Sequence, residues 1–153
     1  YSATSSEGFD RALNISAYSL APLCKSAKSL FSEGAGVISL TYLGSERAIP
    51  NYNVMGVAKA ALEASVRYLS AELGPEKQVR VNAISAGPIR TLASSAIGGI
   101  LDMIHNVEEK APLRRTVTQT EVGNTAAFLL SELSSGISGQ TIYVDAGYCI
   151  NGM

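Results

Sequence analysis

Apolar residues recur every three or four positions over two long stretches, and we expect both stretches to be helices. The first runs from Phe9 to Phe31, with a bend expected at Pro22 because proline lacks the N–H that a helix needs. Asn51 and Asn53 are good capping residues for the second helix, which is expected to stop at Gly74-Pro75.

Three short apolar runs rich in β-branched residues predict buried strands at 37–41, 79–84 and 140–145. Thr118-Gln-Thr-Glu121 has the spacing of a capping box and predicts a helix to about Ser131. Helices alternate with the strands, which is the order of a parallel sheet wound with helices. We therefore expect an α/β, Rossmann-type doubly wound parallel sheet, forming a single domain over residues 1–153.

This alternation starts halfway through the usual pattern. No strand followed by a glycine-rich, phosphate-binding turn stands near the start, so the dinucleotide fingerprint is absent from this chain. The sequence is expected to lack N-terminal strands and to be part of a longer chain. Three strands alone would leave an inner edge unpaired, which proteins normally cover.

Composition narrows the possible functions. The 153 residues carry a net charge of -1 and are 46% hydrophobic, which fits one globular domain. Without a polybasic run we expect no nucleic-acid partner, and without an apolar run of about 20 residues we expect no membrane span. Cys24 and Cys149 match no metal spacing and are expected to be reduced thiols, and the single histidine, His105, is expected at the surface, so no metal site is predicted.

Tyr52 and Lys59 are the most informative pair of polar residues. Seven helical positions separate them by about 10 Å along the axis and return them to nearly the same face. Tyr52 could donate a hydrogen bond to a reacting oxygen while Lys59 binds an extended cofactor and lowers the pKa of the tyrosine. Taken alone, the pair is more often an interfacial tyrosine and a solvated lysine on an amphipathic helix than a catalytic pair.

The surrounding sequence favours the chemical interpretation. The chain resembles the C-terminal half or more of the enoyl-acyl-carrier-protein reductases of bacteria and plastids, a divergent branch of the short-chain dehydrogenase/reductase superfamily, with cyanobacterial members most similar. The matching blocks are YLGSERAIPNYNVMGVAK (42–59), RVNAISAGPIRTLA (80–93), PLRRT (112–116), GISG (136–139) and YVD (143–145).

The resemblance implies reduction of the trans-2 double bond of a fatty acyl thioester carried on acyl carrier protein, in fatty acid biosynthesis. It makes Tyr52 the catalytic tyrosine, Lys59 the lysine that binds the nicotinamide ribose, and Tyr42 a second active-site tyrosine that lines the acyl pocket. Tyr42 could instead be a strand-end residue packed under a lid. Met55 stands four residues before Lys59, where ketoreductases carry their tyrosine, and would offer an apolar wall to the acyl chain.

The resemblance also assigns a cofactor segment and a lid. The cofactor, NADH or possibly NADPH, would be bound by Lys59 and by Ile89, Arg90, Thr91, Leu92 and Ala93, with the Ile89 backbone on the nicotinamide carboxamide and Thr91 on the diphosphate. A tight Gly-Pro turn without a ligand is the alternative. A mobile substrate-binding loop at about 91–111 would place Ala93, Ile97, Ile100 and Met103 against the acyl chain, although a plain amphipathic surface helix has the same periodicity.

Larger-scale properties follow from the same resemblance. The active unit would be a homotetramer in which the two long helices pair between subunits, in the cytoplasm, or in the plastid stroma if the source is a plant. Arg114-Arg115 could form salt bridges within the fold or contact the acidic carrier protein, and Asp145 is expected to fix the turn at Ala146-Gly147. Two rivals remain: a non-catalytic fragment or scaffold half that needs its N-terminal complement, and another short-chain dehydrogenase/reductase.

Overall fold

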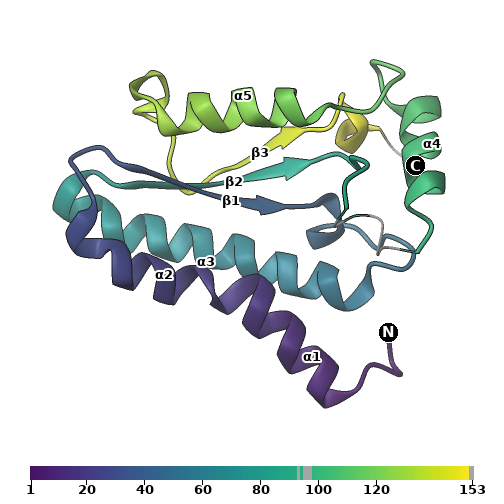
Figure 1. Cartoon of the computed structure of the whole chain (residues 1–153), viewed down its shortest axis with the longest axis horizontal. Helices are drawn as coiled ribbons and strands as arrows, with labels where there is room; N and C mark the ends of the chain where they lie inside the picture. The colour runs from purple at the N-terminus through teal and green to yellow at the C-terminus, as the bar shows by residue number, and fades with distance from the viewer. Residues whose placement is uncertain (93, 95–97, 152–153) are drawn as a thin grey trace.

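The computed structural model describes residues 1–92, 94 and 98–151, which form a parallel sheet with helices on both faces (Figure 1). The sheet has three strands in the order β1-β2-β3, namely β1 (Gly36–Thr41), β2 (Arg80–Ala86) and β3 (Thr141–Val144). Both pairings are parallel, with Gly36 opposite Arg80 and Ala83 opposite Thr141. The predicted α/β class and the three predicted strands are confirmed.

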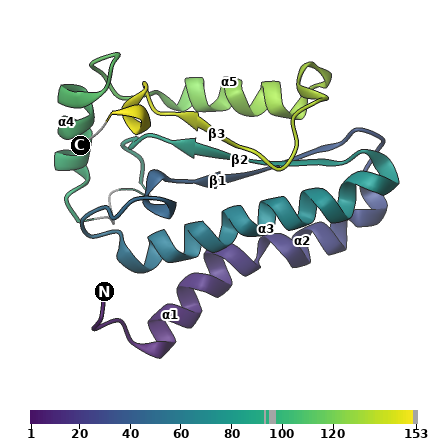
Figure 2. The same cartoon turned by 180° about the vertical axis from the view of Figure 1, so that it is seen from behind.

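Helices form two layers around this sheet. α1 (Ser6–Leu13), α2 (Leu20–Ala27) and α3 (Asn53–Lys77) lie on one face, and α5 (Gln119–Leu130) lies on the other (Figures 1 and 2). α4 (Ile100–Lys110) stands beyond the carboxyl ends of the strands. That is the end at which open parallel sheets bind ligands.

The first predicted helix is interrupted, but not where the sequence suggested. A π-helix, η1 (Asn14–Tyr18), separates α1 from α2, and the N–H of Ser19 reaches back five residues to the carbonyl of Asn14 at 3.1 Å. Pro22 lies in the first turn of α2 and cannot donate to the carbonyl of Tyr18. The irregularity therefore falls one turn before the proline, and a short 3-10 turn, η2 (Lys28–Leu30), ends the segment.

Both ends of α3 also differ from the prediction. Its N-cap is Tyr52, whereas Asn53 is already helical and accepts only from the neighbouring N–H of Val54, at 2.6 Å. The helix continues through Gly74-Pro75 to Lys77 and ends at Gln78, which has a φ of 52°. Its last turn is held by contacts with the segment before β1, because the Lys77 ammonium donates to the carbonyl of Phe31 at 2.7 Å.

α5 begins as predicted. The Thr118 side chain accepts from the N–H of Glu121, and the Glu121 carboxylate accepts from the N–H of Thr118, so the capping box is formed. The other end of α5 is tied to the sheet by Arg80, a buried side chain that donates to the carbonyls of Leu129, Ser131 and Ser134. A 3-10 turn, η5 (Glu132–Ser134), leads from there towards β3.

Two apolar clusters fill the interior. The larger lies between α3 and the sheet and includes Val66, Leu73, Val81 and Ala83. The second lies at the carboxyl ends of the strands, where Leu43 and Val107 pack beside the C-terminal turn η6 (Tyr148–Ile150). Among the described residues no helix is both long and apolar enough to cross a membrane.

Candidate active site

Tyr42 and Tyr52 meet at the carboxyl end of the sheet. Tyr42 follows β1 directly and Tyr52 caps α3, and their rings are in edge contact with centroids 4.8 Å apart and planes at 75°. Tyr52 is 9% exposed. Burial raises the pKa of both phenols above the ordinary value. Both hydroxyls are therefore protonated near neutral pH and can act as donors.

The direction of the Tyr52 pKa corrects one expectation. Lys59 was expected to lower it, but desolvation of the phenol raises it, since the ring is enclosed by protein. The residue remains suited to donating a hydrogen bond or proton, whereas a pre-formed phenolate is disfavoured.

The close packing around the Tyr52 ring requires glycine at two positions, 44 and 56. A 3-10 turn, η3 (Leu43–Ser45), passes so close that a Cβ at Gly44 would lie 2.4 Å from Cδ1 of Tyr52. A Cβ at Gly56 would lie 2.5 Å from the carbonyl oxygen of Gly44. The loop after η3 is held by Arg47, which donates to the carbonyls of Cys149 at 3.1 Å and of Asn151 at 3.4 Å.

Lys59 is half-buried two helical turns after Tyr52. Its ammonium donates to the carbonyl of Leu40 at 2.9 Å, which places it at the carboxyl end of β1. Burial lowers the pKa of Lys59, and the charge of Glu63 partly offsets this shift. The polar groups at this edge fit the hydroxyls of a sugar, because an ammonium supplies three donors in a flexible arrangement.

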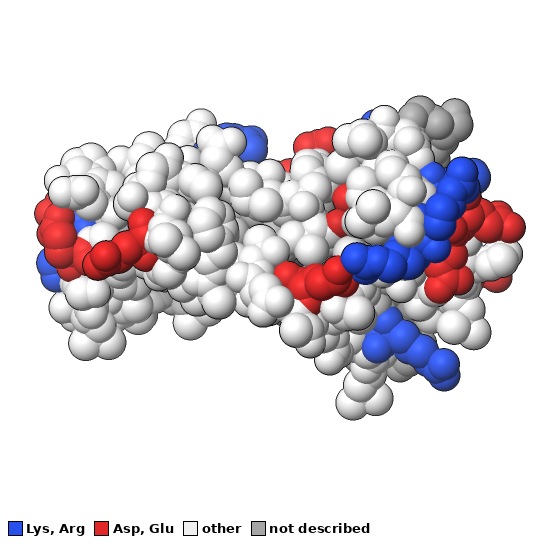
Figure 3. Space-filling view, turned by 90° about the horizontal axis from the view of Figure 1, so that it is seen from above, with Lys and Arg blue, Asp and Glu red and all other residues white. Residues whose placement is uncertain are grey.

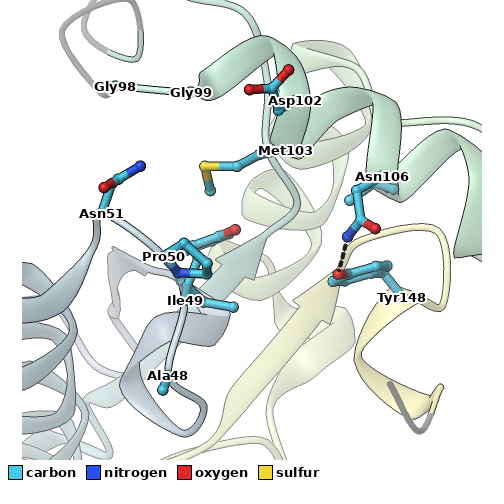
Figure 4. A pocket seen from close by; sticks show the side chains of 12 residues that line it. Ala48, Ile49, Pro50, Asn51, Gly98, Gly99, Asp102, Met103, Asn106 and Tyr148 are labelled. Carbon is cyan, nitrogen blue, oxygen red and sulfur yellow. Dashed lines mark hydrogen bonds between the residues drawn. The ribbon is translucent and has the colours of Figure 1, made fainter.

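A cavity of about 350 Å³ lies between the segment before α3 and helix α4 (Figure 4). Its described walls are formed by Tyr42, Ala48, Ile49, Pro50, Asn51, Gly98, Gly99, Asp102, Met103, Asn106, Val107 and Tyr148. The Asn106 amide donates to the Tyr148 hydroxyl at 2.6 Å and so joins α4 to η6. Its size and partly apolar walls suit a small-molecule or lipid-like group.

A second cavity, of about 450 Å³, is lined by Tyr52 but not by Tyr42, whereas the first is lined by Tyr42 but not by Tyr52. Tyr52, Gly56 and Ala60 of α3 form one wall, and residues 44–49 form another. Ala48 and Ile49 line both cavities. The two tyrosines therefore stand between two spaces, one on the side of α4 and one on the side of α3.

The predicted substrate residues are only partly brought together. Met103 lies on the wall of the α4 cavity, whereas Ile100 belongs to the first turn of α4 but is not among the described wall residues. Ala93 and Ile97 lie outside the described residues.

Met55 lies beside η1 in the structure. Its sulfur lies 3.9 Å from the hydroxyl of Ser16 in η1, and it lines neither space. On the helix it is turned by about 60° from Tyr52 and by about 40° from Lys59. The structure thus does not place Met55 as the apolar wall that the sequence suggested.

The predicted cofactor segment follows the carboxyl end of β2. Ser94 closes it into a turn: its hydroxyl donates to the carbonyl of Ile89 at 2.7 Å and accepts from the N–H of Thr91 at 2.7 Å. The Thr91 hydroxyl accepts in turn from the N–H of Ser94 at 3.0 Å. Arg90 and Leu92 are exposed. The segment lies at the same end of the sheet as Lys59, and the Thr91 hydroxyl is an acceptor in this turn, which leaves its O–H as a donor.

Several structural expectations are confirmed. Asp145 accepts from the N–H groups of Gly147 and Cys149, at 3.0 and 2.7 Å, and so fixes the C-terminal turn. Arg115 pairs with Glu121 within the fold, at 2.7 Å. His105 is exposed beside Glu109, and both cysteines are free thiols.

Four residues at this site were not predicted from the sequence, namely Glu63, Gly44, Asn106 and Tyr148. Glu63, four positions after Lys59, could have been found from helical spacing, since residues i and i+4 share a face. The close approach at Gly44 and the Asn106–Tyr148 hydrogen bond join segments that are distant in sequence, and no local pattern signals them.

A family model described as "Enoyl-(Acyl carrier protein) reductase" matches residues 1–149. The chain belongs to this family. Among curated relatives, the enoyl-acyl-carrier-protein reductase (NADH) FabI of Nostoc sp. is 70% identical over 153 residues, and that of Synechocystis sp. is 69% identical over 147 residues. The matches cover 100% and 96% of this chain but only 59% and 57% of those relatives.

Solved structures of enoyl-acyl-carrier-protein reductases share the fold. The enzyme of Bacillus cereus, in complex with NADP+ and indole naphthyridinone, superposes with a TM-score of 0.95 at 55% identity, covering 99% of this chain and 58% of that one. The enzyme of Anaplasma phagocytophilum in complex with NAD gives a TM-score of 0.92 at 43% identity. The chain thus has the architecture of somewhat more than half of these reductases.

Proposed function

We propose that this chain carries the catalytic tyrosine, the cofactor-binding lysine and the substrate cavity of an enoyl-acyl-carrier-protein reductase. The reaction is reduction of the trans-2 double bond of an enoyl thioester during fatty acid biosynthesis. The observation that carries the proposal is the contact between Tyr42 and Tyr52 between two cavities, with Lys59 further along the same helix.

Tyr52 has the main chemical role in this proposal. When bound, the nicotinamide supplies a hydride to C3 of the acyl group, and negative charge then develops on the thioester oxygen. The neutral hydroxyl of Tyr52 donates a hydrogen bond to that oxygen and stabilises the charge. Tyr42 holds the Tyr52 ring by its edge contact and lines the acyl cavity. A proton from solvent would then add at C2, collapse the enolate to the thioester and complete the reduction.

We assign the cofactor as NADH, with NADPH possible. Lys59 would bind the nicotinamide ribose, and the segment Ile89, Arg90, Thr91, Leu92 and Ala93 would contact the nicotinamide and diphosphate. The names of the relatives support the assignment: the Nostoc enzyme is of the NADH type and that of Staphylococcus aureus is of the NADPH type. The Thr91 hydroxyl accepts from the N–H of Ser94, and its own O–H remains a donor that can contact a diphosphate oxygen.

We assign the acyl chain to the cavity beside α4. Met103 contributes an apolar wall there, and residues 91–111, including Ala93, Ile97 and Ile100, would close over the substrate and exclude water. Lys and Arg side chains gather mainly at the α4 end of the face shown in Figure 3. Arg114, which is exposed in the segment after α4, is available to an acidic carrier protein, whereas Arg115 is paired with Glu121.

We further infer a homotetramer that acts in the cytoplasm, or in the plastid stroma if the source is a plant. Exposed apolar side chains on η1 and α2, namely Ile15, Tyr18 and Leu23, support association of subunits through this layer. The two free thiols agree with a reducing compartment.

The test is oxidation of the reduced cofactor with a crotonyl thioester. It should be run on this chain alone and on a fusion that adds the N-terminal segment of the Nostoc relative, which is 70% identical over the shared part. We expect turnover by the fusion. Tyr52→Phe should lower kcat by about a hundredfold or more, as expected for loss of a donor to the developing oxyanion.

Tyr68→Phe is the matched control, since it removes a hydroxyl from the same helix at a residue that is 78% exposed. Equal activity of the Tyr52→Phe and control proteins would contradict the role of Tyr52. Turnover of a ketone that survives Tyr52→Phe would indicate a different short-chain dehydrogenase/reductase.

The coverage of the relatives favours a second possibility. Because the chain spans 59% of the Nostoc enzyme, the isolated polypeptide could be a non-catalytic scaffold half. It would then bind no nicotinamide cofactor alone and would gain binding only with an N-terminal complement. Activity of the isolated chain would exclude this possibility.

A further inference from the structure

Glu63 is a buried carboxylate that the proposed chemistry does not use. Only 7% of the residue is exposed, and its Oε1 accepts a hydrogen bond from the Thr41 hydroxyl at 2.5 Å. Removing a carboxylate from water is unfavourable unless polar partners compensate. Glu63 also lies four positions after Lys59 on α3, one turn further along the same face.

Two consecutive residues of β1 bind these two side chains of α3. The carbonyl of Leu40 accepts from the Lys59 ammonium at 2.9 Å, and the hydroxyl of Thr41 donates to Glu63. An ammonium and a carboxylate are thereby fixed one helical turn apart at the carboxyl end of an edge strand. The Leu40 carbonyl fixes the position of the Lys59 ammonium, and the Thr41 hydroxyl fixes the Glu63 carboxylate close enough for its charge to act on that ammonium.

Few ionisable groups act on the pair formed by Lys59 and Glu63. Glu63 is the negative charge that acts on Lys59, where it offsets part of the burial that lowers the lysine pKa. Tyr143 on β3 lies in register with Ser85 and Thr41 across the sheet, and burial raises its pKa. Glu46, which follows η3, acts on Tyr143, and Tyr42 and Tyr52 at the open end of the site are neutral near pH 7.

We propose that Glu63 is a positioning residue: its carboxylate, anchored on Thr41, holds the Lys59 ammonium at the end of β1 in the place where it binds the cofactor sugar. This inference rests on the proposed role of Lys59 in cofactor binding. Glu63 touches neither substrate nor cofactor in this scheme and acts only through Lys59.

The first test needs no cofactor and uses the chain itself. Isotope labelling of lysine follows the titration of the Lys59 ammonium by NMR. Glu63→Gln preserves the shape and the acceptor for Thr41 but removes the charge, so the Lys59 titration should move to lower pH. Glu76→Gln is the matched control on the same helix, because Glu76 pairs with Lys28 at 2.8 Å and should shift only that lysine.

A folded Glu63→Gln protein with an unchanged Lys59 titration would overturn the proposal. If this variant does not fold, the unmodified chain still decides. The carbon-13 shift of the Glu63 carboxyl group should then change when the nearby Lys59 ammonium loses its charge. A Glu63 signal that is insensitive to that step would also exclude the proposed coupling.

The second test measures cofactor affinity in the fusion protein. Glu63→Gln should weaken binding of the reduced cofactor by about fivefold or more, a coupling of ordinary size. The loss should be larger at about pH 9 than at about pH 6, because the variant lysine loses its charge earlier. Glu63→Asp keeps the charge and should retain most of the affinity.

Equal losses for the Gln and Asp variants, independent of pH, would mean that Glu63 only supports the fold. A fusion protein that binds no cofactor at all would refute the proposed function instead. The NMR titration would then still test the pairing of Glu63 with Lys59.

Discussion

The Tyr52 ring can take its observed position only because Gly44 has no Cβ. Because a Cβ there would lie 2.4 Å from the Tyr52 ring, Gly44→Ala must displace the ring, the η3 turn or both. We expect a stability loss of about 1–3 kcal/mol, as for other overpacked sites, measured by denaturant unfolding. In the fusion protein kcat should fall more than cofactor affinity, since Lys59 is not in contact with Gly44.

Gly123→Ala is the control for this prediction. Gly123 lies in α5 and has open space where its Cβ would be, so the substitution should be neutral or slightly stabilising. Unchanged stability and turnover in Gly44→Ala would show that the observed ring position is unnecessary.

The sequence predicted the chemical roles of residues better than it predicted where their side chains lie in the fold. Tyr52 and Lys59 were singled out by their spacing and given their roles by the surrounding sequence blocks, and the structure places both at the carboxyl end of the sheet. Met55 was expected beside the acyl chain, but its sulfur lies 3.9 Å from the Ser16 hydroxyl of η1, and it is not among the described wall residues of either cavity. Only tertiary packing determines that contact, so the sequence could not reveal it.

At the scale of elements, the hydrogen bond between Asn106 and Tyr148 connects α4 to η6. Tyr148 is held by a rigid turn, because Asp145 binds two N–H groups there and a Cβ at Gly147 would lie 2.9 Å from Pro112. Removing the bond should therefore loosen α4 rather than η6. We expect Asn106→Ala to increase hydrogen exchange of amides in α4 by about five- to tenfold, corresponding to loss of one hydrogen bond.

The same variant should raise the KM for an enoyl thioester in the fusion protein more than it changes kcat, since α4 forms a wall of the acyl cavity. Asn124→Ala, on the exposed surface of α5, is the control. Protection of α4 that is the same in both variants would show that the bond does not hold the helix.

The start of α5 should respond to acid. Hydrogen bonds from Arg115 and Thr118 lower the pKa of Glu121 from 4.5 to about 2. The folded-state pKa is lower than the unfolded one, so this contribution is complete above about pH 4.5 and is lost as pH falls towards 2. A carboxyl NMR titration should find the low pKa, and Arg115→Gln should raise it. A Glu121 that titrates normally beside Arg115 would contradict the pairing.

Local signals explain which elements were predictable. The capping box of α5 and the β-branched runs of the strands act within a few residues, and both were found with small boundary errors. The end of α3 was missed because Gly74-Pro75 is a local stop signal that contacts of the last turn override, including the bond from Lys77 to Phe31. The π-helix was missed because Pro22 acts on the preceding turn.

At the scale of the whole molecule, two features need a partner surface. β1 is the outermost strand of the described sheet, and the layer formed by η1 and α2 exposes Ile15, Tyr18 and Leu23. Exposed apolar patches of this kind commonly mark interfaces. The sequence suggested association through both long helices, whereas these three apolar groups all lie on the first of them, and their spacing cannot give the number of subunits.

Leu23 provides a test of the proposed assembly. It is 67% exposed on α2, so Leu23→Glu should leave the fold intact while placing a charge in the proposed subunit contact. We expect light scattering after gel filtration to show a smaller species than the parent fusion protein. Leu133→Glu, at a residue that is 83% exposed in η5 on the opposite side of the sheet, should leave the mass unchanged. If both variants keep the parent mass, subunits do not associate through Leu23; if the parent is itself a monomer, the tetramer is excluded.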